Sequence, residues 1–259
     1  MSTGIVSGPG VVYRVNPVAK LAAALLLSAC LVLTVDWVSS AVALTLEIAV
    51  LPLAGLPART FWLRTAAVWI AAPLTAVTIA LYGQPSGRVY AEFLFARVSD
   101  GSIELAIATL LRVLAIGLPA VVLFVTIDPT DLADGLSQLL HLPSRFVLGA
   151  LAALRLVGLF ADDWRSLALA RRARGVADSG RIRRLAGQAF ALLVLSLRRG
   201  NKLATAMEAR GFGSSAHRTW ARQSRWRGRD WVMVVIGAAI GAVAVAASVS
   251  TGQWNSIVG

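Results

Sequence analysis

The sequence predicts an all-α membrane protein with five transmembrane helices and a large helical cytoplasmic region. Of its 259 residues, 57% are hydrophobic and 15% are charged, whereas soluble domains average about 45–50% and about 25%. Five apolar stretches are long enough to cross a bilayer, and most basic residues lie in one segment between the fourth and the fifth. This composition excludes a simple soluble enzyme.

The five expected spans each approach the roughly 20 residues that cross a hydrocarbon core of about 30 Å. They cover residues 18–35, 38–56, 65–82, 103–126 and 231–254. Pro52, Pro73 and Pro119 lie inside them and are expected to kink the helices without breaking them, because neighbouring helices can satisfy the freed carbonyls. Lys20, near the start of the first span, is expected to extend its ammonium group to the lipid headgroups.

The distribution of Lys and Arg predicts the orientation, because short loops with positive charge stay in the cytoplasm. With the N-terminus inside, 22 of the 25 cations lie on the cytoplasmic side, two lie outside, and Arg112 lies within the membrane. Residues 127–230 hold 18 of them. We therefore expect four spans in residues 1–126, a cytoplasmic region in residues 127–230, and a fifth span with an external tail in residues 231–259.

The cytoplasmic region must fold, because structureless loops beyond about 12–15 residues are uncommon. Asp128 followed by Pro129 is typical of a helix start, and the leucine spacing that follows predicts a short amphipathic helix. The longest helix of the region is expected to begin after Pro143 and to end near Gly175. Two further helices are expected over residues 185–197 and 201–210, the first at the membrane surface or packed on the other helices of the region.

The triplet Ala-Arg-Gly occurs twice where a helix is expected to end, as Ala173-Arg174-Gly175 and Ala209-Arg210-Gly211. Glycine suits the position after a helix because it readily adopts the left-handed conformation. Arginine in the last turn complements the helix dipole, so two well-capped helices would explain the triplets. An arginine between two small residues can also enter a partner's groove with its rigid guanidinium fork.

In their setting, these triplets resemble the transmembrane (T) component of energy-coupling factor (ECF) transporters, the family of the biotin and cobalt transporter T subunits. The resemblance is carried by NPVAKL, DPTDLADGLSQLLHLPSRF, ALRLVGLFADDWRSLALARRARG and NKLATAMEARGFG, and it covers most of the chain. In that family each motif arginine docks into one of two ABC-type ATPase subunits. The resemblance thus assigns ATPase docking to Arg174 and Arg210 with their flanking Ala and Gly residues.

The resemblance also implies a transport system of several proteins. A separate membrane protein, the S component, would capture a vitamin or a transition-metal ion such as cobalt or nickel for uptake. The cytoplasmic region would consist of coupling helices that transmit ATP-driven motion of the ATPases to the membrane. The location implied is a prokaryotic plasma membrane, with a multi-pass chain whose N-terminus is cytoplasmic and whose C-terminus is external.

The chain itself is not expected to be an enzyme or to hold a cofactor. It has no G-x-x-x-x-G-K-[ST] motif, and neither of its lysines, Lys20 and Lys202, follows a glycine. ATP and magnesium should therefore be bound by the partner ATPases. One cysteine and two histidines leave too few ligands for a Cys/His metal site. Nucleic acid is not an expected partner, because the positive-inside rule accounts for the basic residues, which can contact anionic lipid.

Ionisable residues in or near the bilayer are functional hypotheses by default. For Glu47 and Arg112, structural pairing or contact with the S component is favoured over ion transport. Arg155 in the long loop helix either braces that helix or is solvated. Two rival functions stay open at this point. A stand-alone permease or channel with a basic regulatory loop would need a polar path, and a membrane enzyme would need converging catalytic groups.

Overall fold

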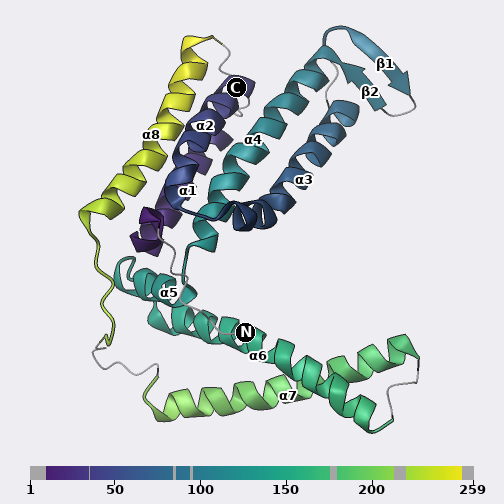
Figure 1. Ribbon diagram of the computed structural model, residues 1–259, viewed down its shortest axis with the longest axis vertical. Helices are drawn as coiled ribbons and strands as arrows, with labels where there is room; N and C mark the ends of the chain where they lie inside the picture. Colours follow the sequence, from purple (N-terminus) through teal and green to yellow (C-terminus); the bar gives the residue numbers. More distant parts are fainter. Residues whose placement is uncertain are drawn as a thin grey trace. The chain divides into compact units, whose positions relative to one another are not determined.

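The computed structural model describes residues 10–34, 36–83, 86–93, 96–175, 180–212 and 220–252. Within these ranges the chain packs into two compact units. The bundle unit contains the described parts of residues 4–135 and 224–259, and the loop unit is Leu136–Gln223. Each unit has its own packing, and the helices of both are labelled in Figure 1.

The bundle unit is built from long apolar helices. Its elements are the 3₁₀ segments η1 (Val11–Arg14) and η2 (Leu51–Ala54), the strands β1 (Val89–Phe93) and β2 (Ala96–Ser99), and the helices α1 (Pro17–Val32), α2 (Trp37–Val50), α3 (Ala58–Tyr82), α4 (Asp100–Val125) and α8 (Gly228–Ser250). Helix α1 packs on α8, α3 packs on α4, and α2 contacts both α4 and α8 (Figure 1). The sequence analysis expected the helices but not the antiparallel β1–β2 hairpin between α3 and α4.

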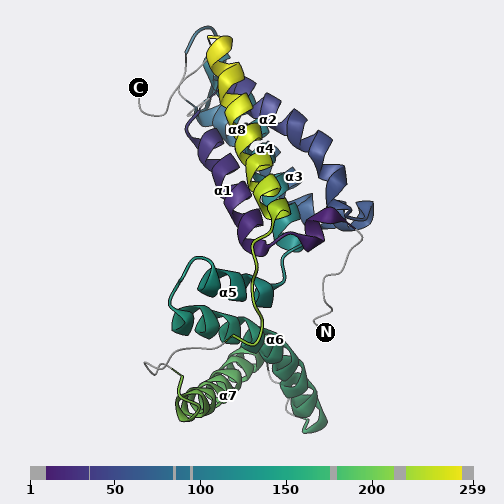
Figure 2. The same ribbon diagram turned by 90° about the vertical axis from the view of Figure 1, so that its left-hand side faces the viewer.

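The loop unit consists mainly of two long helices that cross, α6 (Ser144–Ala173) and α7 (Arg181–Ala209), as Figure 2 shows. Helix α5 (Pro129–Gln138) precedes them and starts as predicted, because the Asp128 carboxylate accepts a hydrogen bond of 2.7 Å from the Thr130 amide. The prediction of separate helices over 185–197 and 201–210 is wrong. Helix α7 continues through Gly200, because one glycine costs a helix only about 1 kcal/mol.

The exterior of the bundle unit is apolar and its interior holds polar groups. Leu25, Ile70 and Phe124 are each at least two-thirds exposed. Lys20, Glu47, Ser102 and Asp230 are almost fully buried, along with several other Ser and Thr residues. A soluble protein hides its large apolar side chains and rarely buries Lys, Glu or Asp, so this distribution is that of a multi-pass membrane protein.

The predicted count of five spans is not confirmed. Four helices in the described ranges are long and apolar enough to cross a bilayer, namely α3, α4, α6 and α8. Helices α1 and α2 have 16 and 14 residues, which gives lengths of about 24 and 21 Å at 1.5 Å per residue. Helix α6 qualifies by length and composition although it lies in the segment expected to be cytoplasmic.

Two local predictions need correction. Pro52 does not kink a continuous second span, because α2 ends at Val50 and the chain continues as the 3₁₀ segment η2. Pro73 and Pro119 do lie inside unbroken helices, as predicted. Lys20 does not extend to the headgroups. It is 1% exposed, and its ammonium group donates to the backbone carbonyl of Thr126 at 2.9 Å and to its hydroxyl at 3.0 Å.

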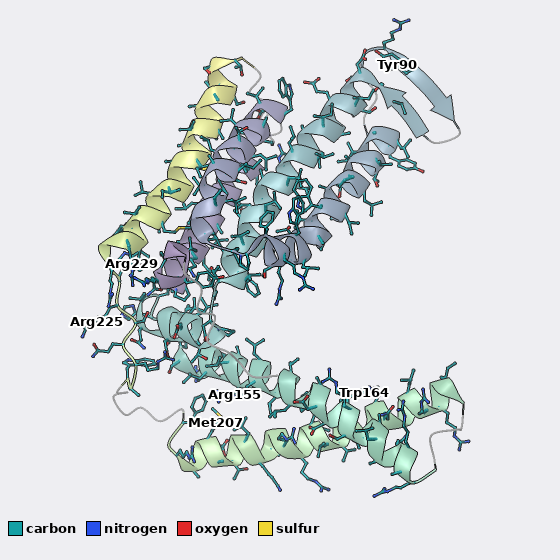
Figure 3. All side chains as sticks on the ribbon, viewed as in Figure 1. Tyr90, Arg155, Trp164, Met207, Arg225 and Arg229 are labelled. Atoms are coloured by element: carbon teal, nitrogen blue, oxygen red, sulfur yellow. The ribbon has the colours of Figure 1, made fainter. Side chains whose placement is uncertain are left out.

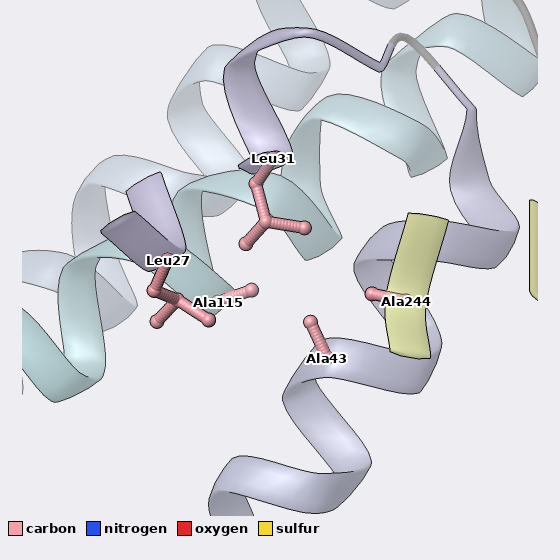
Figure 4. Close-up of a cluster of buried hydrophobic side chains, with 5 residues drawn as sticks. All are labelled: Leu27, Leu31, Ala43, Ala115 and Ala244. Atoms are coloured by element: carbon pink, nitrogen blue, oxygen red, sulfur yellow. The ribbon is translucent and has the colours of Figure 1, made fainter. Parts of the chain in front are cut away.

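Small side chains allow the bundle helices to approach closely. Leu27, Leu31, Ala43, Ala115 and Ala244 form one buried cluster (Figure 4). At the α1–α8 contact, a Cβ added to Gly237 would lie 2.8 Å from the Ala23 carbonyl oxygen. Helix association in membranes depends on such close packing, because lipid supplies little hydrophobic driving force between helices.

We expect Gly237→Ala to destabilise the bundle by about 1–3 kcal/mol, the usual cost of overpacking. Thermal unfolding in detergent, followed by circular dichroism, measures the change. Gly228→Ala is the matched control, because the same methyl group on the same helix meets no atom within 4 Å. Equal melting temperatures for the two variants would contradict the close α1–α8 contact.

Candidate functional site: two equivalent helix ends

The second Ala-Arg-Gly triplet forms a complete glycine-terminated helix end. Helix α7 ends at Ala209, Arg210 is its C-cap residue, and Gly211 follows with φ of 76°. The Gly211 amide donates to the Glu208 carbonyl at 2.9 Å, and the Phe212 amide donates to the Met207 carbonyl at 2.9 Å. These two bonds define the Schellman motif, which requires a left-handed residue after the cap.

The first triplet has the same backbone conformation. Helix α6 ends at Ala173, Arg174 is the C-cap residue with φ −90° and ψ 4°, and Gly175 has φ of 64°. Arg210 has nearly identical values, φ −90° and ψ 11°. The Gly175 amide donates to the Arg172 carbonyl at 3.1 Å. Two triplets with the same letters therefore have the same local structure.

All six residues of the two triplets are exposed. A Cβ at Gly175 would meet no heavy atom within 4 Å, so this glycine is required by its left-handed φ and not by crowding within the chain. The small Ala and Gly neighbours leave each arginine accessible from outside. An exposed guanidinium with five donors is suited to carboxylates or to carbonyl groups at a helix end.

The crossing of α6 and α7 fixes where the two helix ends lie along α7. The Asp163 carboxylate accepts a hydrogen bond of 2.6 Å from the Arg199 guanidinium, and the Arg171 guanidinium donates to the Arg184 carbonyl at 3.4 Å. The first helix end is thus close to the start of α7, and the second lies at its other end. From Arg184 to Arg210, α7 rises by about 40 Å at 1.5 Å per residue.

The Asp162-Asp163 pair has a structural role in this crossing. Asp163 pairs with Arg199 of α7, and Asp162 lies 3.8 Å from Arg165 on its own helix. No group of three or more His, Cys, Asp or Glu side chains able to hold a metal ion occurs within the described ranges. Arg155 lies on α6 and is exposed (Figure 3).

Glu47 lies apart from the helix ends, in the bundle unit. It is 3% exposed, and neither carboxylate oxygen has a hydrogen-bond partner among the described residues. It lines a cavity of about 290 Å³ between α1, α2, α4 and α8, whose other lining residues are apolar except Arg229. The structure does not pair Glu47 with Arg112.

Arg112 instead contacts the turn between α1 and α2. Its guanidinium donates to the backbone carbonyl of Thr34 and lies within electrostatic reach of the Asp36 carboxylate. Asp36 also caps α2, accepting a hydrogen bond of 2.7 Å from the Ser39 amide. The intramembrane arginine thus connects α4 to the first turn of the bundle.

Another group of polar residues, not identified as a site from the sequence, lies within the bundle unit, near the starts of α1 and α8 and the end of α4. Asn16 and Lys20 at the start of α1 bond to Thr126 after α4 and to Ser224 and Asp230 at the start of α8. We call these five residues the junction. One signal was available in the sequence: Lys20 and Asp230 are charged residues at the ends of long apolar stretches.

With its apolar exterior and its buried charges, the fold is that of a multi-pass membrane protein, and it carries two matching helix ends. Residues 10–220 match the family described as cobalt transport protein, CbiQ. This match covers well over half of the chain, and the chain belongs to this family, the T components of ECF transporters. The resemblance noted from the sequence is thereby confirmed.

Curated relatives agree with this assignment. The protein named energy-coupling factor transporter transmembrane protein EcfT from Bacillus selenitireducens is 29% identical over 243 residues, covering 89% of this chain and 90% of the relative. The EcfT of Bacillus subtilis is 28% identical over 245 residues, covering 89% and 91%. That of Lactococcus lactis is 27% identical over 244 residues, covering 89% and 91%.

We expect Gly175→Ala and Gly211→Ala to loosen the last turn of α6 and of α7 respectively. A Cβ in the left-handed conformation costs about 1–2 kcal/mol. Amide hydrogen exchange of the purified chain should show faster exchange in the affected turn only. Gly158→Ala, inside α6 with open space around it, is the control and should not speed exchange. Unchanged protection in both test variants would contradict the left-handed helix ends.

Proposed function

We propose that this chain is the coupling subunit of an ECF-type importer. It transmits ATP-driven motion of two ABC-type ATPase subunits to a substrate-binding S membrane protein, which takes up a vitamin or a transition-metal ion. The proposal is supported most directly by the two exposed Ala-Arg-Gly helix ends, which share one backbone conformation and lie about 40 Å apart along α7.

A pair of equivalent helix ends is the geometry expected for a partner made of two similar subunits. Arg174 serves one ATPase and Arg210 serves the other. Each guanidinium forms hydrogen bonds to acceptors in a groove, and the adjacent alanine and glycine let the groove walls approach the helix end. Lysine could not replace arginine there, because its single ammonium group lacks the planar fork.

In this proposal the chain contributes no catalytic group. ATP and magnesium are bound and ATP is hydrolysed in the partner ATPases, and the S protein provides substrate specificity. The two long loop helices are the coupling helices. The names of the curated relatives, which are energy-coupling factor transporter transmembrane proteins, support this division of labour.

We expect the double variant Arg174→Glu, Arg210→Glu to lose the ATPases in a mild-detergent pull-down of the tagged chain. Charge reversal places a carboxylate against acceptors that favour a guanidinium, so recovery should fall at least about tenfold, the effect of roughly 1.4 kcal/mol. Each single variant should retain part of the binding. Mass spectrometry of the co-purifying proteins measures the recovery.

The matched control is Arg198→Glu, which reverses one exposed charge in the middle of α7 outside both triplets. It should recover the ATPases like the wild-type chain. Normal recovery with the double variant would overturn the docking assignment. Recovery of the wild-type chain alone, without ATPases or a small membrane protein, would favour a stand-alone permease instead.

The proposed orientation places the N-terminus and loop unit in the cytoplasm and the β-hairpin outside. On a Cys30→Ser background, Tyr90→Cys in the hairpin should react with a membrane-impermeant thiol reagent in intact cells. Leu142→Cys, before α6, should react only after permeabilisation. Both side chains are exposed, so a difference in labelling reports sidedness. The reverse pattern would contradict the orientation.

A further inference from the structure

The junction connects the segment that leaves the bundle unit with the segment that returns to it. The outgoing segment follows α4 and contains Thr126 and Gly135. The returning segment begins at Ser224 and leads into α8. Both reach the start of α1: a Cβ on Gly135 would lie 2.6 Å from the Val18 side chain and 3.6 Å from the Ser224 hydroxyl.

Asn16 bonds to the returning segment at three points. Its backbone amide donates to Asp230 Oδ1 at 2.7 Å, and its side-chain amide donates to the Ser224 hydroxyl at 3.0 Å and to the Arg225 carbonyl at 3.5 Å. Its own side-chain oxygen caps α1 by accepting from the Val18 amide at 3.0 Å. One residue therefore fixes both the first turn of α1 and the approach to α8.

Lys20 bonds to the outgoing segment one turn further along α1. Its buried ammonium group has two hydrogen bonds to Thr126, at the end of α4. The Asp131 carboxylate of α5 lies close enough for electrostatic attraction. A cation at the C-terminal end of a helix also interacts favourably with the helix dipole.

Asp230 completes the junction on the α8 side. It is 1% exposed, and its second carboxylate oxygen accepts from the Arg227 amide at 2.7 Å. Buried hydrogen bonds to a charged group are shorter and about twice as strong as neutral ones. Replacing the carboxylate by an amide would leave one of the two backbone amides, that of Asn16 or that of Arg227, without its acceptor.

We propose that Asn16, Lys20 and Asp230 are positioning residues that transmit movement of the cytoplasmic region to α1, α4 and α8. This inference rests on the proposed function and adds to it the residues through which movement reaches the helices of the bundle unit. Residues 220–227, which lead into α8, form no helix or strand. If movement passed only along this irregular segment, changes in its backbone angles would absorb it. The hydrogen bonds of Asn16 to Ser224 and Asp230 hold the segment against the start of α1, so that it moves together with the helix.

The test uses Lys20→Met and Asp230→Asn in the full chain, purified with its ATPases and S protein in lipid nanodiscs. Lys20→Met keeps the length of the side chain but removes the donor, and Asp230→Asn keeps its shape but removes the charge. On a Cys30→Ser background, spin labels at Tyr82→Cys and Ser250→Cys report the distance between the ends of α3 and α8. Both positions are exposed, and neither is a junction residue: Tyr82 ends α3, and Ser250 ends α8, at the opposite end of that helix from Asp230.

We expect the distance in the otherwise wild-type complex to change between the ADP-bound and the vanadate-trapped states. In both junction variants this change should be lost, while ATPase recovery and the hydrolysis rate stay within about twofold of wild type. Arg59→Met, which removes an exposed cation of the same unit, is the control and should retain the full change. Melting temperatures of each complex show whether a variant is folded.

The outcomes separate this inference from the proposed function. If the wild-type chain recovers no ATPases, the proposed function fails. If ATPases are recovered but folded junction variants show the wild-type distance change, the junction does not transmit the movement. No distance change in the wild-type complex would also overturn the inference, because no movement would then reach α8 relative to α3.

Discussion

A polar group that the bundle buries can find a hydrogen-bond partner only inside the protein, because the surrounding hydrocarbon offers none. This constraint determines which residues hold the helices together. Lys20 bonds to the end of α4, Asp230 bonds to the approach of α8, and Arg112 bonds to the turn that follows α1. The apolar helices supply close packing, and these few polar contacts decide which helix ends meet.

The same constraint explains why Lys20 is buried although a lysine near a span end can reach the headgroups. The last carbonyls of α4 have no partner within their own helix. Lys20 supplies a donor to the Thr126 carbonyl and hydroxyl. An outward-pointing lysine would leave that helix end without this donor. The inward conformation therefore gives both the ammonium group and the Thr126 carbonyl a hydrogen-bond partner.

The sequence predicted much of this structure because its strongest signals are local. Apolar length located α3, α4 and α8, and Asp128 caps α5 as predicted. The triplets predicted two helix ends with left-handed glycines, and both occur. The resemblance to the T-component family depended on the same segments.

The remaining features depend on contacts that local patterns do not contain. The sequence predicts separate helices over residues 185–197 and 201–210, yet Arg199 pairs with Asp163 of α6 and α7 continues. Helix α6, expected from the sequence to be cytoplasmic, is also long and apolar enough to cross a bilayer. The burial of Lys20 and Asp230 likewise depends on segments more than 100 residues away.

The continuity of α7 bears directly on the proposed function. Two separate helices joined near Gly200 would let the two arginine-bearing ends move independently, and one ATPase could shift without consequence for the other. A single helix of 29 residues, supported by α6 at the Asp163–Arg199 pair, keeps Arg174 and Arg210 at a nearly fixed separation. Opposed movements of two ATPase subunits must then rotate or displace α7 as a whole. In the proposed function, a rigid helix between two docking points is what converts relative motion of the ATPases into motion of the loop unit.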